Sequence, residues 1–315
     1  MDIAIVDPAS QDVAILGPQR IGELLDAFIS AQDVKANSKG LYKRTLKQYF
    51  GWVVSKSYSL SQITRVELLR YKDELLASGM SPLTVASYIT SVRRFYEWAE
   101  ANKYYPNVAK GIKSPKRRQQ FKKQPLLPAQ ATSLLSYFED KALRDYAIVN
   151  LLLRTGLRTV EVIRANVEDI TFKAGKRVLL VHGKGRDSKD SFVILTDKAY
   201  QPIAKYLDAR GRTKGGEPLF TSTSNNSKGE RLTTRTISYI VKEGLKGIGM
   251  DSRDFTAHSL RHTTAVNILR AGGRIEDAQG VLRHTSPATT QIYTATIQEE
   301  MRLKNATEEL LDSLY

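Results

Sequence analysis

The residues best suited to chemistry are histidines, arginines and a tyrosine in the second half of the chain. His258 and Arg261 are three positions apart, so they lie one turn apart on one face of a helix predicted over residues 257–271. They stand near the start of that helix, where the free amide groups favour an anion. The pair therefore indicates a place where a negatively charged group is held.

His284 and Tyr293 form a second candidate pair. Nine residues separate them, which on a continuous helix is two and a half turns and would point the two side chains in opposite directions. Ser286 and Pro287 supply an N-cap and a first-turn proline, which predict that a new short helix begins there. The break lets the phenol of Tyr293 turn toward the face that carries His284.

Two further cations stand upstream. Arg158 follows Gly156, a predicted left-handed cap for a helix over residues 141–154, and Glu161 is placed to orient it. Lys184 stands between two glycines in a polar loop that joins strands predicted over residues 177–181 and 192–195. Taken singly, these residues also have simpler interpretations, such as a surface ion pair for Arg158 and Glu161 or a hydrogen-bonded polar residue for His284.

Composition limits the chemistry that these residues can do. The chain has 315 residues, no cysteine and four histidines, which excludes disulfides, thiol catalysis and cysteine-based metal sites. No apolar run approaches the ~18 residues that a membrane-spanning helix needs, and the first residues are acidic, unlike a secretory signal. The sequence predicts an intracellular protein without membrane contact, in the cytoplasm with the nucleoid, and with no cofactor and no metal.

The charge indicates a polyanionic partner. Lysine and arginine outnumber aspartate and glutamate by 48 to 33, giving a formal net charge of +15, so nucleic acid is the first candidate and a merely basic protein is the alternative. Residues 111–125 include two prolines and carry six basic and no acidic side chains, which is typical of an exposed linker. Five of these side chains are predicted to contact DNA: Lys116, Arg117, Arg118, Lys122 and Lys123. The alternative is a solvated hinge without specific contacts.

The periodicity predicts two mainly helical domains with a small antiparallel β-sheet in the second. A flexible tail covers residues 1–16, a helical domain 17–110, the basic linker 111–125 and the second domain 126–315. The first domain has predicted helices at 18–32, 39–55, 62–78 and 82–102; in the last of these, aromatic residues follow the apolar stripe and are expected in the core. Helices of the second domain are predicted near 129–138, 141–154, 158–165, 197–209, 233–247, 257–271, 274–282, 287–294 and 297–313.

The order of the candidate residues resembles the tyrosine recombinase (phage integrase) family over about residues 20–310. Gly79-x-Ser81-x-x-Thr84 and the helix after it are similar to the family's core-binding domain. In the second domain the matching motifs are Thr155-Gly156-Leu157-Arg158-x-x-Glu161, Gly183-Lys184-Gly185, His258-Ser-Leu-Arg261-His262-Thr, Leu282-Arg283-His284 and Thr290-x-x-Tyr293-Thr. The sequence departs from the family pattern at two places. Arg283 stands where a glycine is usual, and its added side chain could bind phosphate or shift the local backbone. The loop after Lys184 is more acidic than usual, which keeps Lys189 as a rival to Lys184 for the role of general acid.

The resemblance implies DNA cleavage and rejoining through a covalent bond between Tyr293 and a 3′-phosphate, in a clamp of two domains around the duplex. It assigns Arg158 and Arg261 to the non-bridging phosphate oxygens, which suits rigid bidentate guanidinium groups. His258 would be the base, Lys184 the general acid and His284 a phosphate ligand, with Glu161 positioning the arginines. No ATP or metal is needed, because the phosphotyrosyl bond keeps the energy of the broken linkage.

The implied partners are double-stranded recombination sites bound by a homotetramer, with a possible directionality factor or host DNA-bending protein. After Tyr293, an apolar stripe on an acidic segment is expected to pack either on its own core or on a neighbouring subunit: Ile297, Met301, Ala306, Leu310 and Leu314. The function is either integration of a mobile element or resolution of chromosome dimers. Two alternatives are a type IB topoisomerase and a DNA-binding regulator without catalytic activity.

Overall fold

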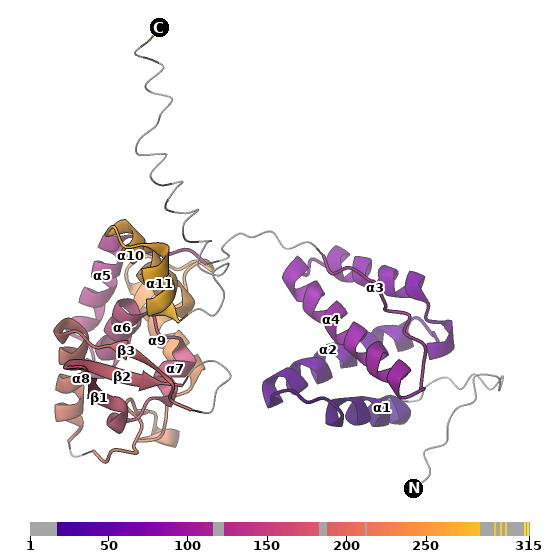
Figure 1. Cartoon of the computed structure of the whole chain (residues 1–315), viewed down its shortest axis with the longest axis horizontal. Helices are drawn as coiled ribbons and strands as arrows, with labels where there is room; N and C mark the ends of the chain where they lie inside the picture. Colours follow the sequence, from indigo (N-terminus) through magenta and orange to yellow (C-terminus); the bar gives the residue numbers. More distant parts are fainter. Residues whose placement is uncertain are drawn as a thin grey trace. The chain divides into compact units, whose positions relative to one another are not determined.

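A computed structural model describes residues 18–115, 123–182, 188–211 and 213–283, and beyond these residues 293, 297, 300, 312 and 314. The chain divides into two compact units, Met1–Arg118 and Gln119–Tyr315. Each has its own hydrophobic core. The predicted fold class is confirmed: the described residues are mainly helical, with one small antiparallel sheet in the second unit (Figure 1).

The first unit is a group of four helices, α1 (Pro18–Ser30), α2 (Ala36–Ser55), α3 (Arg65–Ala77) and α4 (Pro82–Ala101), with a short 3₁₀ turn at Leu60–Gln62. The predicted start of α4 is confirmed, because the Ser81 side chain accepts a hydrogen bond from the Thr84 amide at 3.2 Å and Pro82 occupies the first turn. The helices therefore begin and end within a few residues of their predicted positions.

Aromatic side chains fill the core of the first unit. Phe95 and Tyr96 of α4 are buried and contact Phe28, Tyr49 and Phe50 from α1 and α2. The hydroxyls of Tyr49 and Tyr96 are 2.7 Å apart, so each buried phenol has a polar partner. The prediction that the aromatic residues of this helix belong to the core is confirmed.

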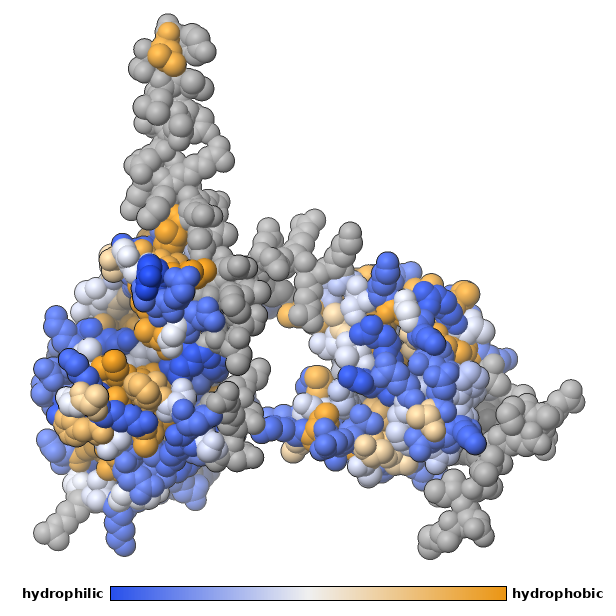
Figure 2. Space-filling view, in the orientation of Figure 1, coloured by the Kyte–Doolittle hydropathy of each residue, from blue (hydrophilic) through white to orange (hydrophobic). Residues whose placement is uncertain are grey.

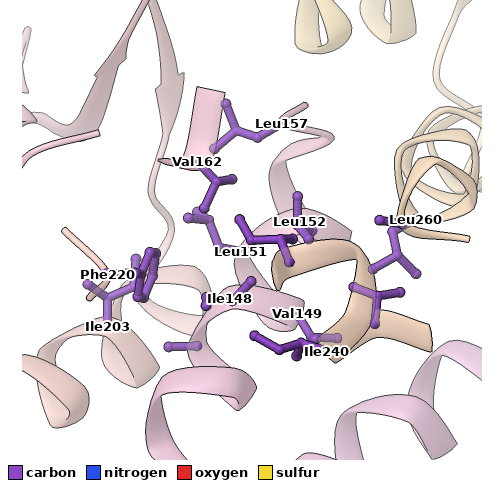
Figure 3. Packing of buried hydrophobic residues seen from close by; sticks show 14 of the residues in the cluster. Ile148, Val149, Leu151, Leu152, Leu157, Val162, Ile203, Phe220, Ile240 and Leu260 are labelled. Carbon is purple, nitrogen blue, oxygen red and sulfur yellow. The ribbon is translucent and has the colours of Figure 1, made fainter. Parts of the chain in front are cut away.

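The second unit packs around one buried helix. Its helices are α5 (Pro128–Glu139), α6 (Leu143–Thr155), α7 (Thr159–Arg164), α8 (Asp197–Arg210), α9 (Thr234–Gly247), α10 (Ala257–Arg270) and α11 (Ile275–Leu282), with 3₁₀ turns at Val167–Asp169 and Asn225–Ser227. Figure 3 shows Ile148, Val149, Leu151 and Leu152 of α6 surrounded by side chains from α7 to α10. Apart from exposed Leu143 and Arg154 near its ends, most of this helix is buried, so it is the core helix and fixes the positions of the helices that carry the site.

The sheet has three strands in the order β1 (Ile170–Lys173), β2 (Lys176–Val181) and β3 (Ser191–Ile194). The two predicted strands correspond to β2 and β3, but β1 was not predicted. It pairs antiparallel with β2 from Ile170 opposite Leu179 to Lys173 opposite Lys176. β3 also has four residues, but its Val193 is buried, whereas no residue of β1 is buried and the strand shows no apolar alternation. The turn after β1 begins with Ala174 at a φ of 46°, a conformation that alanine does not signal.

The surface of the second unit carries apolar side chains over the sheet. Phe172, Phe192 and Ile194 are exposed, and Figure 2 shows orange and pale-orange side chains gathered there among hydrophilic ones. The Lys173 ammonium lies 5.0 Å from the centroid of the Phe192 ring. Within the described part of the chain, no helix is both long and apolar enough to cross a membrane.

The two helices predicted over 287–294 and 297–313 lie mostly outside the described residues. Ile297 is buried beside Ala265, Val266 and Leu282 of its own unit, and the Glu300 carboxylate takes two hydrogen bonds from Arg270, one of 3.0 Å from Nε. The apolar stripe therefore begins on its own core. Leu314 is exposed, and the other three members of the stripe lie outside the described residues.

Candidate active site

Arg261 carries a deeply buried charge in the second unit. Its side chain is only 2% exposed, and its guanidinium donates to the carbonyl oxygens of Gly156 and Leu282. Gly156 ends α6 with a φ of 60°, and a Cβ there would lie 2.5 Å from the Leu282 side chain. The predicted glycine cap is confirmed, and it lets the end of α6 approach α10 and α11 closely enough for Arg261 to bridge them.

Glu161 holds two other arginines. Its carboxylate is buried and accepts hydrogen bonds from the Arg158 guanidinium at 2.9 Å and from the Arg158 amide at 2.7 Å. The Arg283 guanidinium donates to the same carboxylate at 2.8 Å. The ion pair of Arg158 and Glu161 is thus mostly buried, and it belongs to a cluster of three residues from the start of α7 and the end of α11.

Tyr293 lies against a histidine. Its hydroxyl is 2.7 Å from Nδ1 of His262, and the ring is 2% exposed. His258, one turn earlier on α10, is exposed, and its ring centroid is 4.5 Å from that of His262. Residues 258, 261 and 262 therefore present two histidines and one arginine on adjoining faces of α10, beside the phenol.

The charges of the site alter the ionisation of its members. Burial raises the pKa of the Tyr293 phenol to about 12, although Arg261 and Arg158 act in the opposite direction. Partial burial, helped by Arg261 and Arg158, lowers the pKa of His258 below its usual 6.5. At neutral pH the phenol is therefore protonated and His258 is mostly neutral. Burial lowers the pKa of Arg261 to about 9, so this guanidinium keeps its charge at neutral pH.

The structure brings together five of the residues that the sequence singled out: Arg158, Glu161, His258, Arg261 and Tyr293. Lys184 and His284 lie outside the described residues, as do Lys116, Arg117, Arg118 and Lys122. Lys123 is described, and its ammonium donates to the carbonyl oxygen of Arg253. Lys189, the rival of Lys184, donates to the buried Asp169 carboxylate and lies 3.8 Å from Glu168.

Two residues of the site were given no definite role from the sequence. His262 was part of a recognised motif, but only the fold shows that it contacts the phenol. The signal for it was its spacing, since His262 is four residues after His258 and so lies beside it on a helix. Arg283 was noted as a departure from the family pattern, but its contact with Glu161 joins positions 122 residues apart and had no sequence signal.

Among the described residues, no three histidine, cysteine or acidic side chains are grouped as metal ligands. The cluster consists instead of cationic groups around one carboxylate, with a tyrosine and two histidines beside them. Such a set can neutralise an anion, hold its oxygens by bidentate hydrogen bonds and accept a proton from the phenol. A phosphodiester is the anion that suits a tyrosine nucleophile in a basic protein.

Comparison with known proteins agrees with this chemistry. Residues 124–300 match the phage integrase family, and residues 21–103 match the phage integrase N-terminal SAM-like domain. The chain is 27% identical to the tyrosine recombinase XerD of Vibrio cholerae over 286 residues, which are 90% of this chain and 93% of the relative. It is 30% identical to the tyrosine recombinase XerC of Pelobacter propionicus over 275 residues, 84% of this chain and 86% of the relative.

Solved structures show the same fold. The XerH site-specific recombinase bound to its palindromic difH substrate, in a post-cleavage complex, has a TM-score of 0.73 at 20% identity and covers 92% of this chain and 85% of its own. A lambda integrase tetramer bound to a Holliday junction has a TM-score of 0.65 at 16% identity, with 87% and 76% covered. Because the match to the phage integrase family covers more than half of the chain, the chain belongs to that family, and it is a tyrosine-type site-specific recombinase.

Proposed function

We propose that Tyr293 is the nucleophile of a DNA strand transfer that passes through a 3′-phosphotyrosyl bond. The phenol oxygen attacks the scissile phosphorus, the bond from phosphorus to the 5′-oxygen breaks, and that oxygen leaves with a proton. Rejoining is the same transfer in reverse, with a 5′-hydroxyl as the attacking group. The observation that carries the proposal is the 2.7 Å contact of the Tyr293 hydroxyl with His262, beside the guanidinium groups of Arg158 and Arg261.

The phenol needs both a proton acceptor and nearby positive charge, because its pKa of about 12 leaves it protonated at neutral pH. His262 is placed to accept the proton at Nδ1, which requires the tautomer with hydrogen on Nε2. His258 stands next to it at the surface, where it can contact the phosphate. We therefore assign the first proton transfer to His262, and we assign His258 to a contact with the phosphate.

The arginines stabilise the charge that grows on the phosphate oxygens. Arg261 is held by two backbone carbonyls and Arg158 by Glu161, so both are ordered before DNA binds. Preorganised donors of this kind act in the transition state without further reorganisation. Removal of one should lower the cleavage rate by about 10² to 10³.

The decisive experiment offers the protein a nicked suicide substrate and follows a covalent adduct at the 3′ end. The wild-type chain should form the adduct, and Tyr293→Phe should form none while binding the DNA with nearly the wild-type dissociation constant. A Phe variant that still forms the adduct would show that another residue is the nucleophile. A wild-type chain that binds its site and never forms the adduct would contradict the proposed reaction.

The general acid is assigned to Lys184, and Lys189 is its rival. Lys189 is engaged by Asp169 and Glu168, which favours a structural role at the base of the loop between β2 and β3. Lys184→Ala should slow cleavage by about 10²-fold, and a substrate with sulfur in place of the 5′-bridging oxygen should restore the rate, because a thiolate leaves without a proton. If Lys189→Ala shows this rescue and Lys184→Ala does not, the two roles are reversed.

We also propose that the chain acts as a homotetramer on two paired sites, in integration or excision of a mobile element or in chromosome dimer resolution. The support is the likeness to XerD and XerC and to a lambda integrase tetramer on a Holliday junction. A directionality factor or host bending protein would act on this assembly, which we place in the cytoplasm with the nucleoid. Light scattering of the complex with candidate sites should give four chains for two sites. Recombination of a plasmid that carries two sites tests the proposed activity.

A further inference from the structure

Arg283 occupies an unusual position at the edge of the site. It ends α11 with a φ of 54°, in the left-handed region where glycine is favoured, and its side chain is mostly buried. The guanidinium donates to the Glu161 carboxylate at 2.8 Å and to the Val281 carbonyl at 2.8 Å. A side chain held in this way in a strained backbone conformation indicates a specific role.

The contact with Glu161 bears directly on Arg158. One oxygen of the carboxylate accepts from the Arg158 guanidinium, and the other accepts from both the Arg158 amide and Arg283. The carboxylate side chain is 1% exposed, so its orientation depends on these donors. Arg283 therefore fixes the carboxylate that in turn fixes Arg158.

Arg283 also offsets the negative charge of Glu161. A buried carboxylate orients Arg158, but it also cancels part of the positive potential that a phosphate would meet. With Arg283 present, the cluster of Arg158, Arg261, Arg283 and Glu161 keeps two net positive charges. With a glycine at position 283 it would keep one, at a place where charge interactions are weakly screened.

We propose that Arg283 is a positioning residue of the strand-transfer site, which holds Glu161 against Arg158 and offsets the charge of that carboxylate. This inference rests on the proposed reaction at Tyr293. It assigns Arg283 no direct contact with the scissile phosphate. The strained backbone is tolerated because the side chain supplies an ion pair that glycine cannot.

The test measures single-turnover cleavage of the suicide substrate and the dissociation constant for the same DNA, with melting temperatures as a check on folding. Arg283→Ala should cleave on the order of 10-fold more slowly and bind DNA within about twofold of wild type. Arg283→Lys, which keeps the charge, should recover most of the rate. Arg274→Ala removes an exposed arginine at the other end of α11 and is the matched control, with an unchanged rate.

Two further variants separate the possible explanations. Arg283→Gly relieves the backbone strain, so a rate equal to or above wild type would overturn the inference and show that only the backbone mattered. The pair Arg283→Ala with Glu161→Gln removes both charges and should cleave no more slowly than Arg283→Ala alone. A loss equal to the product of the single losses would make Arg283 a direct phosphate ligand through its own donors and would overturn the positioning role.

The outcomes for the two proposals are distinct. If the wild-type chain forms no adduct, the proposed reaction at Tyr293 fails, and the rates of the Arg283 variants cannot support the inference either. If the wild-type chain forms the adduct and Arg283→Ala forms it at the same rate, the proposed reaction stands and the inference about Arg283 is overturned.

Discussion

At the scale of single residues, the site contains one buried pair of side chains and one exposed histidine. Tyr293 and His262 are buried and hydrogen-bonded to each other, whereas His258 reaches the surface. Burial raises the pKa of the phenol, so the free energy needed to ionise it must come from a base and from the arginines. Replacement of His262, which contacts the phenol, should therefore change the pH dependence of the cleavage rate the most.

We expect His262→Asn to slow cleavage by about 10²-fold at neutral pH, because asparagine cannot accept the phenol proton. The remaining reaction then depends on spontaneous ionisation of Tyr293, so its rate should rise with pH throughout the range below about 12, where that group titrates. As the pH is raised, the wild-type rate should reach its plateau at a lower pH than the rate of the variant does. Single-turnover cleavage rates of both proteins, measured from about pH 6 to about pH 9, test both effects.

A His262→Asn variant with the wild-type rate and the wild-type pH profile would remove His262 from the proton transfer. His258→Asn is the comparison variant for this experiment. A larger loss there than at His262 would return the role of base to His258, as the family resemblance first implied.

At the scale of elements, the sequence predicts the helices and strands that have a clear apolar period and recognisable end signals. Helix α4 shows a clear apolar period, with a serine cap and a proline at its start, and the structure has it at Pro82–Ala101. Strand β1 was missed because none of its four residues is buried and its turn begins with alanine. The contacts of Arg283 with Glu161 and of His262 with Tyr293 join different elements, so they follow from the tertiary packing around α6 and not from spacing.

The turn between β1 and β2 supplies a prediction about stability. Ala174 and Gly175 both have positive φ, of 46° and 72°, which is the condition for a two-residue type I′ turn. Asparagine tolerates the first of these positions better than alanine. Ala174→Asn should therefore raise the free energy of unfolding by about 1 kcal/mol, which is ~2–4 °C in the melting temperature of a unit of this size.

Calorimetry of the full chain can follow the transition of the second unit. Ala174→Val is the matched control, because a β-branched residue is poorly suited to a left-handed conformation, and it should lower the same transition. An asparagine variant that melts at or below the wild-type temperature would contradict the turn type inferred here. DNA cleavage should stay unchanged in the asparagine variant, since Ala174 belongs to no part of the site.

At the scale of the whole molecule, two units with separate cores are joined by the most basic segment of the sequence. Residues 111–125 hold six lysines and arginines and no acidic residue. Each phosphate that such a segment neutralises releases counterions, so its contribution shows in the salt dependence of DNA binding more clearly than in the affinity at one salt concentration. The site in the second unit contributes separately, because its arginines are held by protein groups before DNA arrives.

We therefore expect glutamine at Lys116, Arg117, Arg118 and Lys122 together to make the plot of log affinity against log salt less steep by about 3 to 4, at ~0.9 for each phosphate contact. Lys123→Gln is the comparison variant and should change the slope less, because its ammonium already donates to Arg253. At saturating DNA, the cleavage rate of the fourfold variant should stay within a few-fold of wild type. An unchanged slope would show that the linker is a solvated hinge, and the positive charge that binds the backbone would then have to lie on the two units themselves.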